Sequence, residues 1–144
     1  MKSKIVVVLT LIILLVGCTS PKPVTDDTGV TNEDIESVVR ANNNFAFDFY
    51  RAINKPEENL FFSPYSLSTA LAMTYEGAKE QTAQEMQAVF HYPSIDQLRK
   101  GSASVYNKLN SKDKEVKLNT ANALWAQENF KFLDEYFTNI EKYY

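Results

Sequence analysis

Few side chains in this 144-residue chain could take part in covalent or metal chemistry. The sequence contains one cysteine, Cys18, and one histidine, His91, which we interpret as a surface or packing residue. Ser63 directly precedes Pro64, a pair typical of a helix start, where the hydroxyl caps backbone N–H groups instead of acting as a nucleophile. The sequence has no GxSxG, HExxH or CxxC motif and no glycine-rich phosphate loop, so we expect no enzyme, no metal site and no cofactor.

Residues 1–17 have the pattern of a signal peptide. Lys2 and Lys4 precede an apolar core, Ile5 to Val16, which is too short to span a bilayer as a stable helix. The leader ends in Leu15-Val16-Gly17-Cys18, which resembles the lipobox of prokaryotic lipoproteins, whose cysteine is acylated with diacylglycerol and becomes the first residue of the mature chain. The alternative is an ordinary secretory leader with a chance cysteine. We expect an exported protein, extracellular or at the cell surface, anchored to a membrane by lipid on Cys18.

The residues after the leader have the composition of a flexible tether. Residues 19–30 contain two prolines, a glycine and scattered Thr and Asp without apolar periodicity, so we assign 18–30 to the lipidated cysteine and this tether. Removal of the leader with Lys2 and Lys4 lowers the net charge from −3 to −5. This mildly acidic balance argues against nucleic acid as a partner.

The next residues predict a helix, a short strand and a second helix. Thr31 or Asn32 caps the first helix, which ends near Pro56 and has an apolar stripe. The residues Leu60-Phe61-Phe62 suit a buried strand, and the helix after Ser63 is expected to end at Gly77 in a left-handed conformation. The stripe of the first helix consists of Ile35, Val38, Asn42, Phe45, Phe49 and Ile53.

The second half of the chain predicts three more helices and one strand. Helices are expected over 79–90, from the Ser94 cap to about Leu109, and from Leu133 to Tyr144. Residues 115–127 alternate and predict a strand that is half exposed at its start and covered toward Trp125. Trp125 is interpreted as a core aromatic, with a binding role as the alternative. Basic residues near Arg99, Lys100 and Lys108 favour a solvated face over a weak polyanion site, because acidic residues lie among them.

Two stretches of the sequence resemble the serpins, the serine protease inhibitor family. The first contains Asn59, Phe61-Phe62-Ser63-Pro64, Ser66, the run from Leu67 to Ala72, Gly77 and Thr82. The second is NTANALWAQ, residues 119–127, which resembles the second strand of the main serpin sheet. The resemblance implies an α+β serpin fold, of which residues 31–144 are the N-terminal part, with several helices and an incomplete sheet. Two strands do not make the sheet that these helices must cover.

The resemblance also implies a function. In serpins a protease cleaves an exposed reactive loop, forms an acyl-enzyme and is distorted when the loop inserts into the main sheet as a new strand. Ser63, Pro64 and Ser66 match the shutter beneath that sheet, and Asn119, Asn122 and Trp125 match a core strand. The reactive loop would lie beyond Tyr144, so the fragment alone is expected to be inactive. The expected partner of the full-length monomer is an extracellular serine or cysteine protease.

Two alternatives stay open at this point. The first is a non-inhibitory protein with a serpin fold, which would have bulky or charged residues in the loop hinge. The second is an unrelated surface lipoprotein that binds an extracellular ligand. Neither the target protease nor the scissile residue is encoded in these 144 residues.

Overall fold

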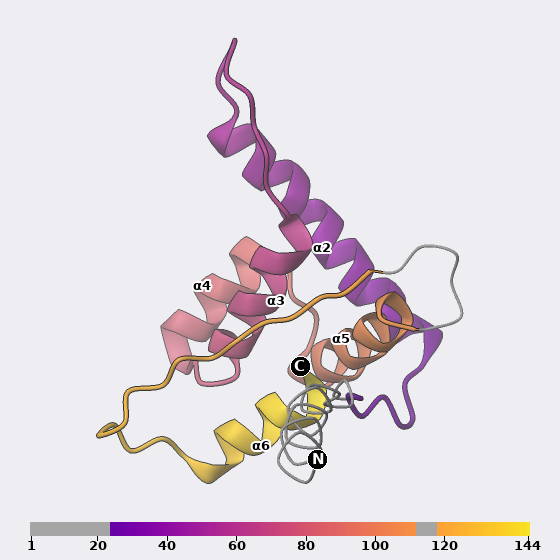
Figure 1. Cartoon of the computed structure of the whole chain (residues 1–144), viewed down its shortest axis with the longest axis vertical. Coiled ribbons are helices and arrows are strands. Elements are labelled where there is room, and N and C mark those ends of the chain that lie inside the picture. Colours follow the sequence, from indigo (N-terminus) through magenta and orange to yellow (C-terminus); the bar gives the residue numbers. More distant parts are fainter. Residues whose placement is uncertain (1–23, 112–117) are drawn as a thin grey trace, which may run out of the picture.

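The computed structural model of the chain describes residues 24–111 and 118–144. The expected leader and Cys18 lie outside these residues. The described part contains five helices, and in Figure 1 the long helix α2 runs along the molecule with the others gathered beside its N-terminal half. Among the described helices, none is long and apolar enough to cross a membrane. The helices are α2 (Asn32–Ile53), α3 (Pro64–Tyr75), α4 (Glu80–Phe90), α5 (Ile95–Leu109) and α6 (Asp134–Tyr143).

Three of the helices begin at the caps that the sequence predicted. Thr31 and Asp34 form a reciprocal capping box at the start of α2, in which each side chain accepts from the backbone N–H of the other residue. The Ser63 hydroxyl accepts from Ser66 N at the start of α3, and Ser94 accepts from Gln97 N at the start of α5. Local hydrogen bonding therefore sets these boundaries, and the predicted helices are confirmed.

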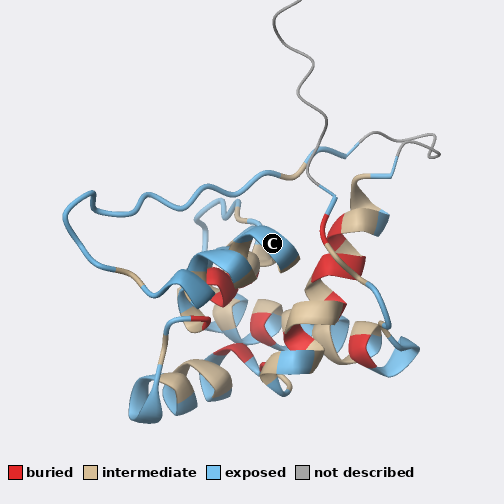
Figure 2. Cartoon of the chain, turned by 90° about the horizontal axis from the view of Figure 1, so that it is seen from below, coloured by how far each residue is buried: buried red, intermediate tan, exposed pale blue. Residues whose placement is uncertain are grey.

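The core lies where α2, α3, α4 and α5 meet. The ring of Phe90 lies 4.7 Å from that of Phe45 and 5.2 Å from that of Tyr92, centroid to centroid. Figure 2 shows the buried residues concentrated on the inner sides of these helices, whereas the long segment between α5 and α6 is almost entirely exposed. The buried members of this core are Phe45, Ala72, Phe90, Tyr92 and Leu98.

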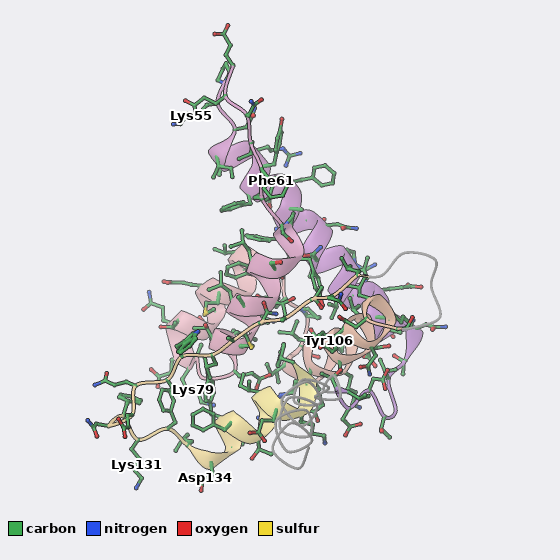
Figure 3. The ribbon with its side chains drawn as sticks, viewed as in Figure 1. Lys55, Phe61, Lys79, Tyr106, Lys131 and Asp134 are labelled. Carbon is green, nitrogen blue, oxygen red and sulfur yellow. The ribbon has the colours of Figure 1, made fainter. Side chains whose placement is uncertain are left out.

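The two predicted strands do not form within the described residues. Residues 60–62 and 118–127 are extended but pair with no neighbouring strand, and the Phe61 side chain is fully exposed (Figure 3). A strand needs a partner for its backbone N–H and C=O groups, and none of the described segments supplies one. The helical half of the predicted α+β class is therefore confirmed, whereas its sheet stays a prediction.

The predicted left-handed stop at Gly77 is wrong. Helix α3 ends through a tight turn, in which Gly77 N donates to Thr74 O at 3.1 Å and Ala78 N to Tyr75 O at 3.0 Å, without a positive φ at the glycine. The left-handed helix end belongs to His91, with φ 55°, after α4. A hydrogen-bonded turn thus replaces the conformation that only glycine adopts freely.

The tether expected before α2 is partly docked on the helices. Thr25 is buried, and hydrogen bonds join it to α5 and its neighbour Asp26 to Lys142 in α6. Composition alone does not reveal such docking, because the bonds join the segment to helices that lie far from it in the sequence.

Candidate functional site at the start of helix α3

The two serines at the start of α3 form a helix cap. Ser63 lies in an extended conformation and its Oγ accepts a hydrogen bond from Ser66 N at 3.3 Å, while Pro64 fills the first turn, where no N–H is needed. Both serine residues are exposed. The cap interpretation is confirmed for Ser63, whose hydroxyl is bonded within the helix start although the residue is exposed.

One turn further along, α3 is fixed to the core by a buried tyrosine. The Tyr92 hydroxyl donates to the backbone oxygen of Ser68 at 2.6 Å. Burial raises the pKa of Tyr92 well above its usual range, because the phenolate would lose its hydration. This bond holds the helix that presents Ser63 and Ser66.

The extended segment 118–127 is held beside this helix start. The Asn110 side chain, at the end of α5, donates to Thr120 Oγ1 at 2.7 Å and accepts from Thr120 N at 3.0 Å. Tyr65 in α3 is half-buried, and its pKa is raised by burial, against the opposing effect of hydrogen bonding to Thr69 and Thr120. These contacts place Tyr65, within the first stretch that resembles the serpins, next to Thr120 in the second stretch. Sequence reasoning missed Asn110, whose only signal was its position at a helix end.

The three residues predicted for a core strand lie along this extended segment. Asn119, Asn122 and Trp125 are all exposed, and Trp125 keeps 93% of its surface open. Trp125 is therefore not a core residue of the described chain. Leu118 and Leu124 of the same segment are exposed as well, as are Phe61 and Phe130 elsewhere in the chain.

A small cavity lies behind the helix start. It has a volume of about 20 Å³, enough for one water molecule, and its lining includes Asn42, Tyr65 and Ser68. The Oδ1 atom of Asn42 is buried and has no hydrogen-bond partner among the described residues. Leaving such an acceptor unpaired costs about 1–3 kcal/mol.

Replacement of Asn42 by leucine is expected to raise the stability of the protein. Leucine has a similar size and removes the unpaired oxygen, so we expect a gain of about 1 kcal/mol in the free energy of unfolding. Thermal unfolding followed by circular dichroism measures the change, with the exposed neighbour Asn43→Leu as the control. A lower stability would contradict this expectation.

The basic residues considered for polyanion binding do not form one patch. Arg99 makes an ion pair with Glu76, 2.7 Å between Nη2 and Oε2, and another with Asp96. Nine residues, about two and a half turns, separate Arg99 from Lys108, so they lie on opposite sides of α5. Lys100 is half-buried. Arg99 and Lys108 therefore do not share one face of α5, and polyanion binding near them stays a prediction.

His91 lies at the end of α4, away from the α3 start. Its Nε2 lies 2.8 Å from Asp48 Oδ2 on α2, and this contact is the largest cause of a lowered Asp48 pKa. The described residues contain no group of three acidic, cysteine or histidine side chains that could bind a metal ion. His91 thus joins two helices, in agreement with the predicted packing or surface role.

Comparison with known proteins identifies the class to which this helical scaffold belongs. The family model named serpin (serine protease inhibitor) matches residues 40–144, so the chain belongs to the serpin family. Among its relatives, a serpin-like protein of Methanosarcina acetivorans is 38% identical over 95% of this chain and 36% of its own length.

Other relatives come from distant organisms. A serpin-like protein of Thermococcus kodakarensis is 41% identical over 74% of this chain and 26% of its own length. The leukocyte elastase inhibitor of Xenopus laevis is 36% identical over 76% of this chain and 30% of its own length. The chain thus spans about a third of the length of these curated relatives.

Proposed function

We propose that the chain is the N-terminal part of an exported serpin that inhibits serine or cysteine proteases. The observation that carries this proposal is the family match over residues 40–144, joined by similarity to proteins named leukocyte elastase inhibitor. Inhibition proceeds through cleavage of a reactive loop and insertion of that loop into the main sheet, and both the loop and most of the sheet belong to the remainder of the protein.

The exposed apolar surface of the extended segment supports this proposal. Trp125 and Leu124 are exposed on a segment that Asn110 binds at Thr120. Large apolar groups gathered on a surface are typical of sites that another element covers. We infer that segment 118–127 is a strand of the complete sheet, with Asn119, Asn122 and Trp125 among its residues.

Ser63 and Ser66 are proposed to serve as part of the shutter beneath the opening sheet. Their small hydroxyls are exposed at a helix start that Tyr92 fixes from below. A hydroxyl both donates and accepts, so it can exchange hydrogen-bond partners when the strands above it separate. A bulky apolar side chain at either position would restrict that movement.

We further propose that the protein is held at a membrane by lipid on Cys18. The support is the sequence Leu15-Val16-Gly17-Cys18 after a short apolar leader. This places the inhibitor outside the cell at the membrane surface, where its expected partner is an extracellular protease.

The proposed inhibition is tested by complex formation with proteases. The complete gene product, incubated with trypsin, chymotrypsin, elastase and papain, is expected to form a covalent acyl-enzyme complex with at least one of them that survives denaturing electrophoresis. Residues 18–144 alone are expected to form none, because they lack the loop that is cleaved. Cleavage of the complete protein by all four without any such complex would contradict the proposal.

A further inference from the structure

The residues before α2 are clamped to α5 by one asparagine. We call residues 24–30 the N-terminal strap. Asn107 binds both backbone groups of Thr25, donating from Nδ2 to the carbonyl oxygen at 2.8 Å and accepting from the N–H at 3.3 Å. The Thr25 hydroxyl donates to Ala103 O at 2.9 Å, and the residue is only 3% exposed. Such a buried and fully bonded residue is a fixed point.

The next residue of the strap is bound to α6. Asp26 N donates to Lys142 O at 2.7 Å, and the Asp26 carboxylate lies 3.3 Å from Lys142 Nζ. The strap therefore joins α5 and α6, two helices that lie far from it in the sequence. In Figure 1 the strap lies at the end of the molecule opposite to the C-terminal end of α2.

This clamp sets how far the folded helices can move from a lipid on Cys18. Seven residues separate Cys18 from Thr25 and can span at most about 25 Å. Without the bonds of Thr25 and Asp26 to α5 and α6, the next fixed point is the Thr31 cap, thirteen residues from Cys18 and at most about 45 Å away. The bonds of the strap together shorten the reach by nearly half.

We propose that the N-terminal strap orients the protein on the membrane, so that the α5 and α6 side bound by the strap faces the bilayer. This inference rests on the lipid proposed for Cys18. Helix α2 has 22 residues and is about 33 Å long, and its far end leads to Lys55, which Figure 3 shows at the opposite end of the molecule. Lys108, next to Asn107 and exposed, is therefore expected to lie near the membrane and Lys55 far from it.

Energy transfer to the membrane tests this orientation. The complete lipidated protein carries a fluorescent amino acid at position 108 or, as the matched control, at position 55, and is placed in phosphatidylcholine vesicles with an acceptor dye on some headgroups. We expect quenching to be several-fold stronger at 108 than at 55. A triple variant frees the strap: Asn107→Leu removes both backbone bonds to Thr25, Thr25→Val removes the hydroxyl bond to Ala103, and Asp26→Ala removes the ion pair with Lys142. It is expected to abolish most of this difference, whereas Thr25→Ser retains it.

The possible failures are distinguishable. Mass spectrometry that shows no diacylglycerol on Cys18 would refute both the proposed anchor and the orientation. A lipidated protein with equal quenching at 108 and 55, or with a difference that the triple variant leaves unchanged, would overturn the orientation alone. Circular dichroism of each variant establishes that the helices are intact.

Discussion

Replacement of Arg99 by methionine is expected to lower the free energy of unfolding by about 3 kcal/mol. Arg99 binds Glu76 through its Nε and Nη2 atoms, at 2.7–3.1 Å, and the Glu76 side chain has no exposed surface. Hydrogen bonding to Glu76 is also the largest cause of a raised Arg99 pKa. Methionine retains an apolar side chain of similar length but leaves the Glu76 charge buried and unpaired. We expect the lower end of the usual range because Arg99 keeps 21% exposure.

A double variant separates the unpaired charge from the loss of packing. Arg99→Met combined with Glu76→Leu removes both charges and is expected to recover most of the stability, since a buried pair replaced by apolar groups costs little. Tyr144 also donates to Glu76, at 3.2 Å, so its hydroxyl loses a partner in this variant. Urea unfolding of the purified complete protein measures each change. Equal losses in the single and double variants would contradict the proposed cause.

Gly101→Ala is expected to destabilise the protein by about 2 kcal/mol, although alanine is the better helix former. A Cβ atom at Gly101 would lie 2.5 Å from Val38 Cγ2 and 2.6 Å from Asp34 O, which is a backbone atom and cannot rotate away. Helices α2 and α5 would have to separate, at a cost of about 3 kcal/mol, against a gain of about 1 kcal/mol from helix propensity.

Gly77→Ala is the control for this effect. Its Cβ would lie 3.3 Å from a ring carbon of Tyr136, a side chain that can shift. We expect a change close to zero when both variants are compared by thermal unfolding. Equal effects at the two glycines would show that close packing of α2 on α5 is not what Gly101 provides.

The sequence predicted those features that depend on neighbouring residues. The caps at Thr31, Ser63 and Ser94 act over three positions, and the apolar stripes repeat within each helix, so both can be read locally. The serpin family was also recognisable from short ordered motifs, and the family match confirms it.

The features that were not predicted depend on partners far away in the chain. Asn107 and Thr25 are 82 residues apart, and Arg99 and Glu76 are 23 apart, so no local pattern signals either contact. The end of α3 was predicted wrongly because a glycine after a helix usually adopts a left-handed conformation, whereas Gly77 adopts a hydrogen-bonded turn. The strand predicted over 115–127 also depends on distant partners, and its described residues 118–127 are extended without a neighbouring strand.

Amide hydrogen exchange of residues 118–127 tests most directly whether this chain is the N-terminal part of a serpin sheet. The segment would be compared in residues 24–144 alone and in the complete gene product. We predict rapid exchange in the shorter chain, except at Thr120, whose N–H donates to Asn110, because the segment has no neighbouring strand there. We predict strong protection of the whole segment in the complete protein, where the sheet pairs its N–H groups. Equally rapid exchange in both would contradict the account, because the segment would then be no part of a sheet.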